Sequence, residues 1–181
     1  MRCAVPDSAA ATIDWPRQIF EVLKAYEVRQ VAHVPDAGHA ALIRMCEADP
    51  AIRTVTLTTE EEGVALLTGA YLGGQRGCLL MQSSGTGNTI NMLSLVKHCR
   101  IPFLAIVTMR GEWGEFNPWQ VPMGLGTRPA LEALGSAVHD AREPGAVKDA
   151  VEAAAKLAFN SFQQCAVTIS QRVLGAKAFK D

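Results

Sequence analysis

The sequence lacks the charge imbalance and the long apolar runs that mark several large classes of protein. Its 17 lysines and arginines almost balance 18 aspartates and glutamates, which gives a formal net charge of −1. Such a balance leaves no electrostatic footprint for nucleic acid and no basic belt for an anionic membrane. No apolar run approaches the roughly 18 residues that span a bilayer, and no basic, apolar leader opens the chain. We therefore expect a cytoplasmic protein that binds neither nucleic acid nor membrane.

Cysteine and histidine are too scattered to indicate a disulfide framework or a metal centre. The five cysteines stand singly, without a CxxC pair, and we expect them to be reduced thiols. The four histidines show neither HxxxH nor HExxH spacing, the arrangements by which helices present zinc ligands. We expect no metal ligands in this chain.

Apolar residues, in contrast, make up 49% of the 181 positions. This composition and length predict a single packed domain over residues 1–181. Segments with helical periodicity alternate with short β-rich or continuously apolar segments, a pattern typical of βαβ units. We expect an α/β fold with three layers, α/β/α, around a mostly parallel sheet. The expected helices are residues 15–26, 37–47, 60–72, 89–98 and 144–159, and the expected strands are residues 30–34, 53–57, 78–82, 102–109 and 164–170.

Residues 110–129 interrupt this alternation. The segment is rich in glycine and proline and contains two of the three tryptophans, and a long structureless stretch inside a compact domain is usually functional or disordered. Its aromatic side chains Trp113, Phe116 and Trp119 are costly to leave in water. A loop wrapped on its own core is one interpretation. We favour the other, a loop that contacts a partner or shapes a site.

Four loops are expected at the carboxyl edge of the sheet, where open α/β proteins bind ligands. They are residues 35–39, 58–62, 83–88 and the segment from Arg110 onward. The glycine-rich turn SSGTGN at 83–88 spells neither GxGxxG nor a Walker motif, so a structural turn and a ligand site are equally good interpretations. Glu60–Glu62 open a helix, where solvated carboxylates complement the helix dipole. Periodicity does not decide which of the three would be buried.

The chain resembles a known family through three long motifs in a fixed order. These are TTEEEGVALLTGAYLGG, LLMQSSGTGNTINMLSLV and RGEWGEFNPWQVPMG, and VPDAGHAAL precedes them. They resemble the pyrimidine-binding domain of thiamine-diphosphate-dependent enzymes. Within these, the resemblance is to the family of the sulfopyruvate decarboxylase alpha subunit and the N-terminal half of phosphonopyruvate decarboxylase. It extends over residues 15–170 and implies the thiamine-diphosphate-binding (pyrimidine domain) fold.

The resemblance implies a catalytic role for Glu61, which matches the family's glutamate at the start of this helix. In the family, a carboxylic acid bonds N1′ of the aminopyrimidine and favours the tautomer that removes the cofactor's C2 proton, while the protein supplies a dry pocket. Desolvation in such a pocket favours the neutral acid. The glycine-rich segment matches the family's loop near the pyrimidine, with Ser83 in place of the usual asparagine. The implied cofactor-binding residues are Glu61, Ser84, Gly85, Thr86, Gly87 and Asn88.

Two further loops are expected to bind the substrate. Asp36 and His39 lie on the first loop, where they would bind the acidic end of a substrate or shuttle a proton. A surface histidine is an equally good interpretation of His39. Arg110 would pair with a sulfonate, phosphonate or carboxylate, or form a structural salt bridge with Glu112 or Glu115.

The sequence contains no GDG motif, with which these enzymes hold Mg²⁺ and the diphosphate in a second domain. The resemblance therefore implies a separate diphosphate-binding (beta) subunit that holds Mg²⁺, and a hetero-oligomer with the active site at the shared interface. The implied function is the alpha (pyrimidine-binding) subunit of a thiamine-diphosphate-dependent 2-oxoacid decarboxylase, which converts 3-sulfopyruvate to sulfoacetaldehyde and CO₂. One alternative is a subunit acting on phosphonopyruvate or another small 2-oxoacid, and another is a non-catalytic α/β binding module.

Overall fold

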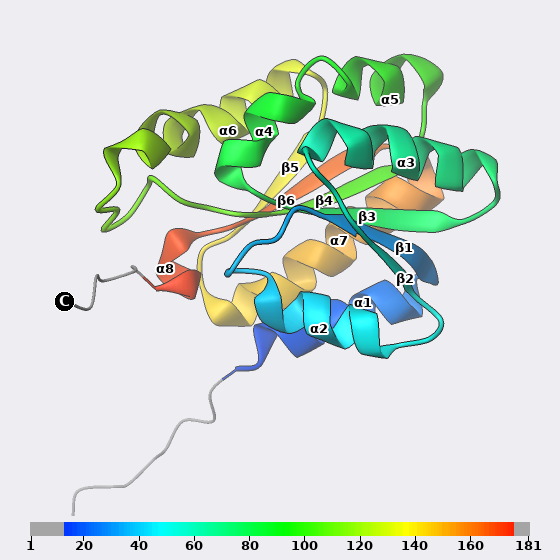
Figure 1. Ribbon diagram of the computed structural model, residues 1–181, viewed down its shortest axis with the longest axis horizontal. Coiled ribbons are helices and arrows are strands. Elements are labelled where there is room, and N and C mark those ends of the chain that lie inside the picture. The colour runs from blue at the N-terminus through cyan, green and yellow to red at the C-terminus, as the bar shows by residue number, and fades with distance from the viewer. Residues whose placement is uncertain (1–12, 176–181) are drawn as a thin grey trace, which may run out of the picture.

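The computed structural model describes residues 13–175, which form one six-stranded sheet (Figure 1). All neighbouring strands are parallel, and their order is β2-β1-β3-β4-β6-β5. The mostly parallel sheet predicted from the sequence is thereby confirmed. The strands are β1 (Val28–His33), β2 (Arg53–Thr56), β3 (Arg76–Gln82), β4 (Phe103–Thr108), β5 (Ala137–Ala141) and β6 (Gln164–Ile169).

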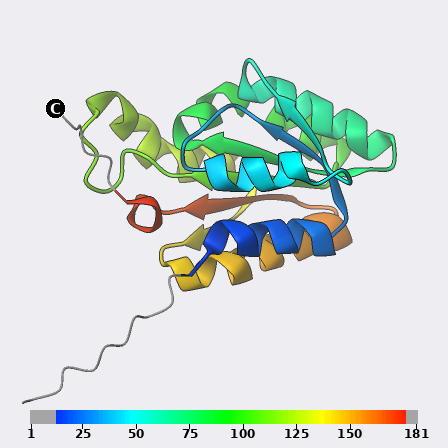
Figure 2. The same cartoon turned by 60° about the horizontal axis from the view of Figure 1, so that its bottom comes forward.

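Helices cover both faces of this sheet, so the three-layer prediction is also confirmed (Figures 1 and 2). The first, second and seventh helices pack on one face, and the third to sixth pack on the other. Every residue of β4 and β6 is buried, because a central parallel strand contacts helices on both sides. The helices are α1 (Trp15–Ala25), α2 (Ala40–Ala48), α3 (Glu60–Leu72), α4 (Ser83–Thr89), α5 (Leu93–Cys99), α6 (Val121–Ala133), α7 (Val147–Ser161) and α8 (Gln171–Leu174), with 3₁₀ turns η1 (Pro118–Gln120) and η2 (Pro144–Ala146).

The direction of the connections places a crevice at the carboxyl edge of the sheet. From β1 the chain passes to α2 on one face, whereas from the neighbouring β3 it passes to α4 on the other. Loops that diverge in this way leave a topological switch point, where open α/β sheets bind ligands. The loops after β1 and β3 are those that the sequence analysis singled out.

The expectation of a structureless segment over residues 110–129 is wrong in its second half, which forms η1 and the start of α6. Gly124 and Gly126 lower the helix propensity of this stretch, and for this reason the helix was not predicted from the sequence. Gly124 allows a close approach instead, because a Cβ there would lie 2.4 Å from the carbonyl oxygen of Arg110. Tertiary packing therefore overrides local propensity in α6.

Two further features bear on the sequence-based expectations. Of the cysteines, Cys46, Cys78 and Cys165 are buried and free and Cys99 is exposed and free, while Cys3 lies outside the described residues. Among residues 13–175, no helix combines the length and the hydropathy that crossing a bilayer requires.

Candidate active site

Hydrogen bonds join the loops at the carboxyl edge of the sheet. Asp36, after β1, accepts hydrogen bonds from Gln82 Nε2 at 3.0 Å and from Thr108 Oγ1 at 2.7 Å. Ser83, after β3, accepts from the backbone N–H of Arg110 at 3.0 Å. These bonds connect the loops after β1, β3 and β4, and Asp36 accepts from the last residues of both β3 and β4.

The three glutamates at the start of α3 have three different environments. Glu60 is buried, and its Oε2 accepts a hydrogen bond from Asn88 Nδ2 at 2.7 Å. Glu62 folds back on Thr58, accepting from its backbone N–H at 2.9 Å and from its hydroxyl at 2.7 Å. These two bonds hold the pKa of Glu62 below its ordinary value. Glu60 and Glu62 are therefore both engaged within the chain.

Glu61 is the glutamate that remains available to a ligand. Its side chain is exposed, and it makes no hydrogen bond or ion pair with any other residue in 13–175. Successive side chains of a helix point about 100° apart. The side chain of Glu61 therefore points in a different direction from those of the buried Glu60 and the Thr58-bound Glu62. The structure thus presents a free carboxylate in the first turn of α3, beside the Glu60–Asn88 contact.

Helix α4 contains the glycine-rich segment and packs closely on the start of α3. A Cβ on Gly85 would lie 2.2 Å from Glu60 Oε1, so glycine is required for this approach. The hydroxyl of Thr86 is buried and has no hydrogen-bond partner within residues 13–175. Gly87 and Asn88 are exposed, and Ser84 donates a hydrogen bond to Gln82 Oε1 at 2.9 Å. The expected turn is therefore a short helix, with small and polar side chains around the contact with α3.

Arg110 is held by a structural salt bridge to Glu115, one of the two alternatives that the sequence left open. Its Nε and Nη2 each lie 2.6 Å from a different oxygen of Glu115, in a bidentate pair. The side chains are only 12% and 3% exposed, so solvent screens the pair little. Glu115 also accepts from Gln171 Nε2 at 2.9 Å. This network lowers the pKa of Glu115 to about 2, chiefly through the bond from Arg110.

The lowered pKa of Glu115 predicts a loss of stability in acid that Glu115→Gln removes. A carboxyl whose pKa is depressed on folding contributes stability above its ordinary pKa, and that stability disappears as the pH falls towards the folded-state value. For Glu115 this window runs from its ordinary 4.5 down to about 2. Urea unfolding at several pH values should show the wild type losing stability more steeply than Glu115→Gln across this window. Parallel pH profiles for the two proteins would contradict the assignment.

His39 lies in the interior, so the alternative of a surface histidine is wrong. The ring is 0% exposed, and its Nε2 lies 3.1 Å from the carbonyl oxygen of Ile106 and 3.3 Å from that of Met81. Burial lowers the pKa of His39, which favours the neutral imidazole that donates from Nε2. In this conformation the ring does not reach a ligand. It instead ties the loop after β1 to β3 and β4.

The residues that position the expected site were not predicted from the sequence. Gln82 and Thr108 hold Asp36, Glu60 holds Asn88, and Gln171 joins the salt bridge of Arg110. Gln82 and Thr108 end buried strands, so their polar side chains at the sheet edge were a usable signal. Gln171 gave no such signal, because it is brought to this loop only by the tertiary fold.

Proteins with similar sequences identify the family of this chain. Residues 14–116 match the family model described as "Thiamine pyrophosphate enzyme, N-terminal TPP binding domain". "Sulfopyruvate decarboxylase subunit alpha" of Methanococcus maripaludis is 38% identical over 131 residues, which cover 72% of this chain and 78% of the relative. The protein of the same name in Methanothermobacter thermautotrophicus is 35% identical over 140 residues, 77% of this chain and 85% of the relative.

A shorter match links the chain to a longer protein. "Phosphonopyruvate decarboxylase" of Streptomyces viridochromogenes is 45% identical over 89 residues, 49% of this chain and 22% of the relative. Among solved structures, a 2-oxoglutarate:ferredoxin oxidoreductase from Magnetococcus marinus superposes with a TM-score of 0.72 at 12% identity. The superposition covers 88% of this chain and 29% of that chain, and it shows a shared fold.

The family match covers more than half of the chain, and the two archaeal relatives match along most of their length at 35% identity or above. The fold and the order of the sheet-edge motifs agree with this match. The chain therefore belongs to the thiamine pyrophosphate enzyme family, of which it contains the N-terminal TPP-binding domain.

Proposed function

We propose that this chain is the alpha, pyrimidine-binding subunit of a thiamine-diphosphate-dependent 2-oxoacid decarboxylase that converts 3-sulfopyruvate to sulfoacetaldehyde and CO₂. The observation that carries the proposal is the free carboxylate of Glu61 in the first turn of α3, between two glutamates that the fold engages. Relatives named sulfopyruvate decarboxylase subunit alpha support the choice of substrate. A phosphonopyruvate decarboxylase that matches half of the chain makes phosphonopyruvate the second candidate substrate.

The residues around Glu61 fit the aminopyrimidine end of thiamine diphosphate. Helices α3 and α4 lie so close at Gly85 that no side chain fits there. The buried hydroxyl of Thr86 has no hydrogen-bond partner among the described residues. We propose that Glu61 bonds N1′ of the aminopyrimidine and that Ser84, Gly85, Thr86, Gly87 and Asn88 line the ring. When bound, thiamine diphosphate supplies an electron sink for the carbon that loses CO₂.

A second subunit is needed to give Glu61 the environment that this role requires. The carboxyl must be protonated to donate to a ring nitrogen, and desolvation is the effect that favours the neutral acid. Glu61 is exposed in the single chain, so we propose that a beta subunit covers it and excludes water. The beta subunit would also hold the diphosphate and Mg²⁺, and relatives named subunit alpha support a separate partner. Within residues 13–175, no group of three or more His, Cys, Asp or Glu side chains is arranged for a metal ion.

The substrate's acidic end would lie in the cavity beside Asp36 and Arg110. These two residues line a cavity of about 320 Å³ together with Thr108 and Arg44. Glu115 engages Nε and Nη2 of Arg110, so Nη1 remains as a donor for an anion. We propose that Arg110 provides this donor and that Asp36 orients the substrate, whereas His39 acts only by holding the loop.

Exposed aromatic side chains near this edge are the proposed contact with the beta subunit. Trp119 is 82% exposed, Phe116 42% and Leu125 70%, which is unusual for large apolar residues close to a ligand site. We expect Trp119→Ser to leave the free energy of unfolding within about 0.5 kcal/mol of wild type. Affinity for the beta subunit should fall at least about 30-fold, because buried tryptophans dominate interface energies.

Phe162→Ser is the matched control for Trp119→Ser. Phe162 is 55% exposed but follows α7 at the opposite, amino edge of the sheet. The affinity of each variant for the beta subunit is measured by titration calorimetry. Phe162→Ser should bind as tightly as the wild type, whereas Trp119→Ser should not. Equal losses in both variants, or no loss in Trp119→Ser, would show that the aromatic segment is not the contact.

The proposal is tested by measuring CO₂ release from the purified chain with and without a GDG-containing partner subunit. We expect release only with the partner, thiamine diphosphate and Mg²⁺ all present, and faster release from 3-sulfopyruvate than from phosphonopyruvate or pyruvate. A preference for phosphonopyruvate would select the second candidate substrate. No release from any of the three acids by the assembled complex would favour the non-catalytic alternative.

A further inference from the structure

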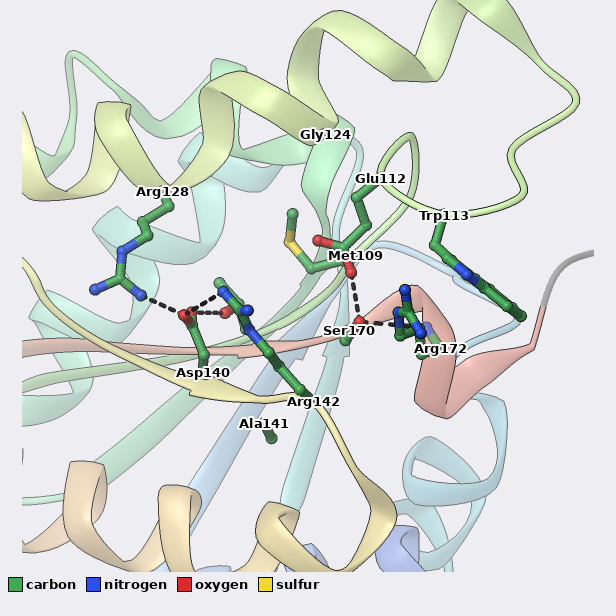
Figure 3. Close-up of a pocket in the computed structure, with 11 residues that line it drawn as sticks. Met109, Glu112, Trp113, Gly124, Arg128, Asp140, Ala141, Arg142, Ser170 and Arg172 are labelled. Atoms are coloured by element: carbon green, nitrogen blue, oxygen red, sulfur yellow. Dashed lines mark hydrogen bonds and ion pairs between the residues drawn. The ribbon is translucent and has the colours of Figure 1, made fainter.

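A second cavity lies at the carboxyl ends of β4, β5 and β6, beneath α6 (Figure 3). Its volume is about 280 Å³, and neither Glu61 nor any residue of α4 lines it. Helix α6 leads to β5 on one face of the sheet, and α7 leads from β5 to β6 on the other. The cavity therefore lies between connections to opposite faces, at the carboxyl edge of the sheet where open α/β proteins bind ligands.

Three arginines and two carboxylates line this cavity, and both carboxylates already accept protein hydrogen bonds. Asp140 lies 2.6 Å from Arg128 Nη1 and accepts from Thr168 Oγ1 at 2.6 Å. Glu112 accepts from Ser170 Oγ at 2.6 Å and from the backbone N–H of Gln171 at 2.8 Å. With its acids engaged, the cavity keeps an excess of positive charge.

The other two guanidinium groups retain free donors. Arg142 is 77% exposed, and its nearest carboxylate oxygen, on Asp140, is 3.7 Å away, which is beyond hydrogen-bond distance. Arg172 lies over the ring of Trp113 at 5.3 Å, and no carboxylate within residues 13–175 pairs with it. Stacking occupies the face of a guanidinium and leaves its in-plane N–H groups free for a bidentate anion.

Hydrogen bonds within the chain hold the backbone on the side of the cavity that carries Arg172. Gln171 is 1% exposed, and its Oε1 accepts from the backbone N–H groups of Glu112 at 3.2 Å and Trp113 at 3.1 Å. Glu112 in turn binds the first residues of α8. These reciprocal bonds hold the backbone of Glu112 and Trp113 against the start of α8, so ordering this backbone on binding costs little conformational entropy.

We propose that this cavity binds a short dianionic organic acid, with one anionic group at Arg142 and the other at Arg172. Figure 3 shows the Asp140 cluster with Arg142 on one side of the cavity and Arg172 with Trp113 on the other. Met109, buried, and Gly124 line the wall between them. A volume of about 280 Å³, with cationic ends and an apolar middle, suits a short chain with an acid at each end. The site is independent of the thiamine chemistry proposed above.

The test is titration calorimetry of the full chain with 3-sulfopropanoate at constant ionic strength and without thiamine diphosphate. Propanoate carries one of the two anionic groups, and inorganic phosphate carries its charge on a single centre. We expect 3-sulfopropanoate to bind to the cavity of Arg142 and Arg172, and both comparison ligands to bind there at least about tenfold more weakly, because a lost charge-assisted hydrogen bond costs about that factor.

The variants Arg142→Gln and Arg172→Gln should each weaken 3-sulfopropanoate at least about tenfold. The matched control is Arg100→Gln, an exposed arginine after α5 at the amino edge of the sheet, which should bind as the wild type does. Circular dichroism of all three variants would identify any loss of folding. The proposal is overturned by absent binding, by unchanged affinity in Arg142→Gln and Arg172→Gln, or by phosphate binding as tightly as 3-sulfopropanoate. Because binding is read without turnover, it stands or falls separately from the decarboxylase proposal.

Discussion

Glu61→Gln in the assembled enzyme is expected to lower the rate of CO₂ release at least about 100-fold, within the range that general acid–base groups contribute. Glutamine keeps the size of the side chain but removes the acidic proton that Glu61 would share with the aminopyrimidine nitrogen. Because Glu61 is exposed and has no partner among the residues that the structure describes, the substitution should leave the free energy of unfolding within about 0.5 kcal/mol of wild type. Initial rates at saturating cofactor, with urea unfolding of the isolated chain, measure both quantities.

Glu62→Gln is the control for this experiment, since it makes the same chemical change one residue further along the helix. Glu62 is engaged by Thr58 and directed away from the position of Glu61. We expect the rate to stay within about threefold of wild type, given the few tenths of a kcal/mol that an exposed hydrogen bond contributes. A normal rate in Glu61→Gln, with a collapse in Glu60→Gln or Glu62→Gln, would transfer the acid role to a neighbouring glutamate.

Gly111→Ala is expected to destabilise the chain by about 2 to 4 kcal/mol, the sum of backbone strain and overpacking. Gly111 has φ +79°, a left-handed conformation that disfavours side chains. A Cβ there would lie 2.1 Å from the carbonyl oxygen of Gln120, and a backbone atom cannot turn aside as a side chain can. Urea denaturation of Gly111→Ala against wild type measures the loss.

Gly74→Ala separates the two contributions. Gly74 has φ +80°, nearly the same as Gly111, but a Cβ there would meet nothing within 4 Å. Its cost should therefore be the backbone strain alone, about 1 to 2 kcal/mol. If both alanine variants lose the same stability, the close approach of residue 111 to η1 and α6 contributes nothing measurable.

The central strands were predictable from sequence because burial on both faces leaves a continuous apolar run. The segment 102–109 is the clearest case, and every residue of β4 is indeed buried. β5, in contrast, was missed. It is an edge strand that pairs only with β6, and four of its five residues are not fully buried, so its sequence AVHDA carries no such run.

The site was predictable as a set of loops but not as a set of contacts. Parallel strands bring their carboxyl ends to one edge whatever the loops contain, so the convergence followed from topology. Which side chain of Glu60–Glu62 is buried depends on Asn88 and Gly85 approaching from another helix. His39 was ambiguous for the same reason, since the carbonyl groups that it contacts belong to strands distant in sequence.

The position of β6 has a consequence for synthesis on the ribosome. Within residues 13–175 it is the last strand, yet it lies between β4 and β5 and provides the only strand neighbour of β5. A nascent chain that lacks β6 can pair β1 to β4, but it leaves β5 without its hydrogen-bonded neighbour in the sheet. Pairing of β5 with the rest of the sheet thus requires the insertion of β6 between β4 and β5.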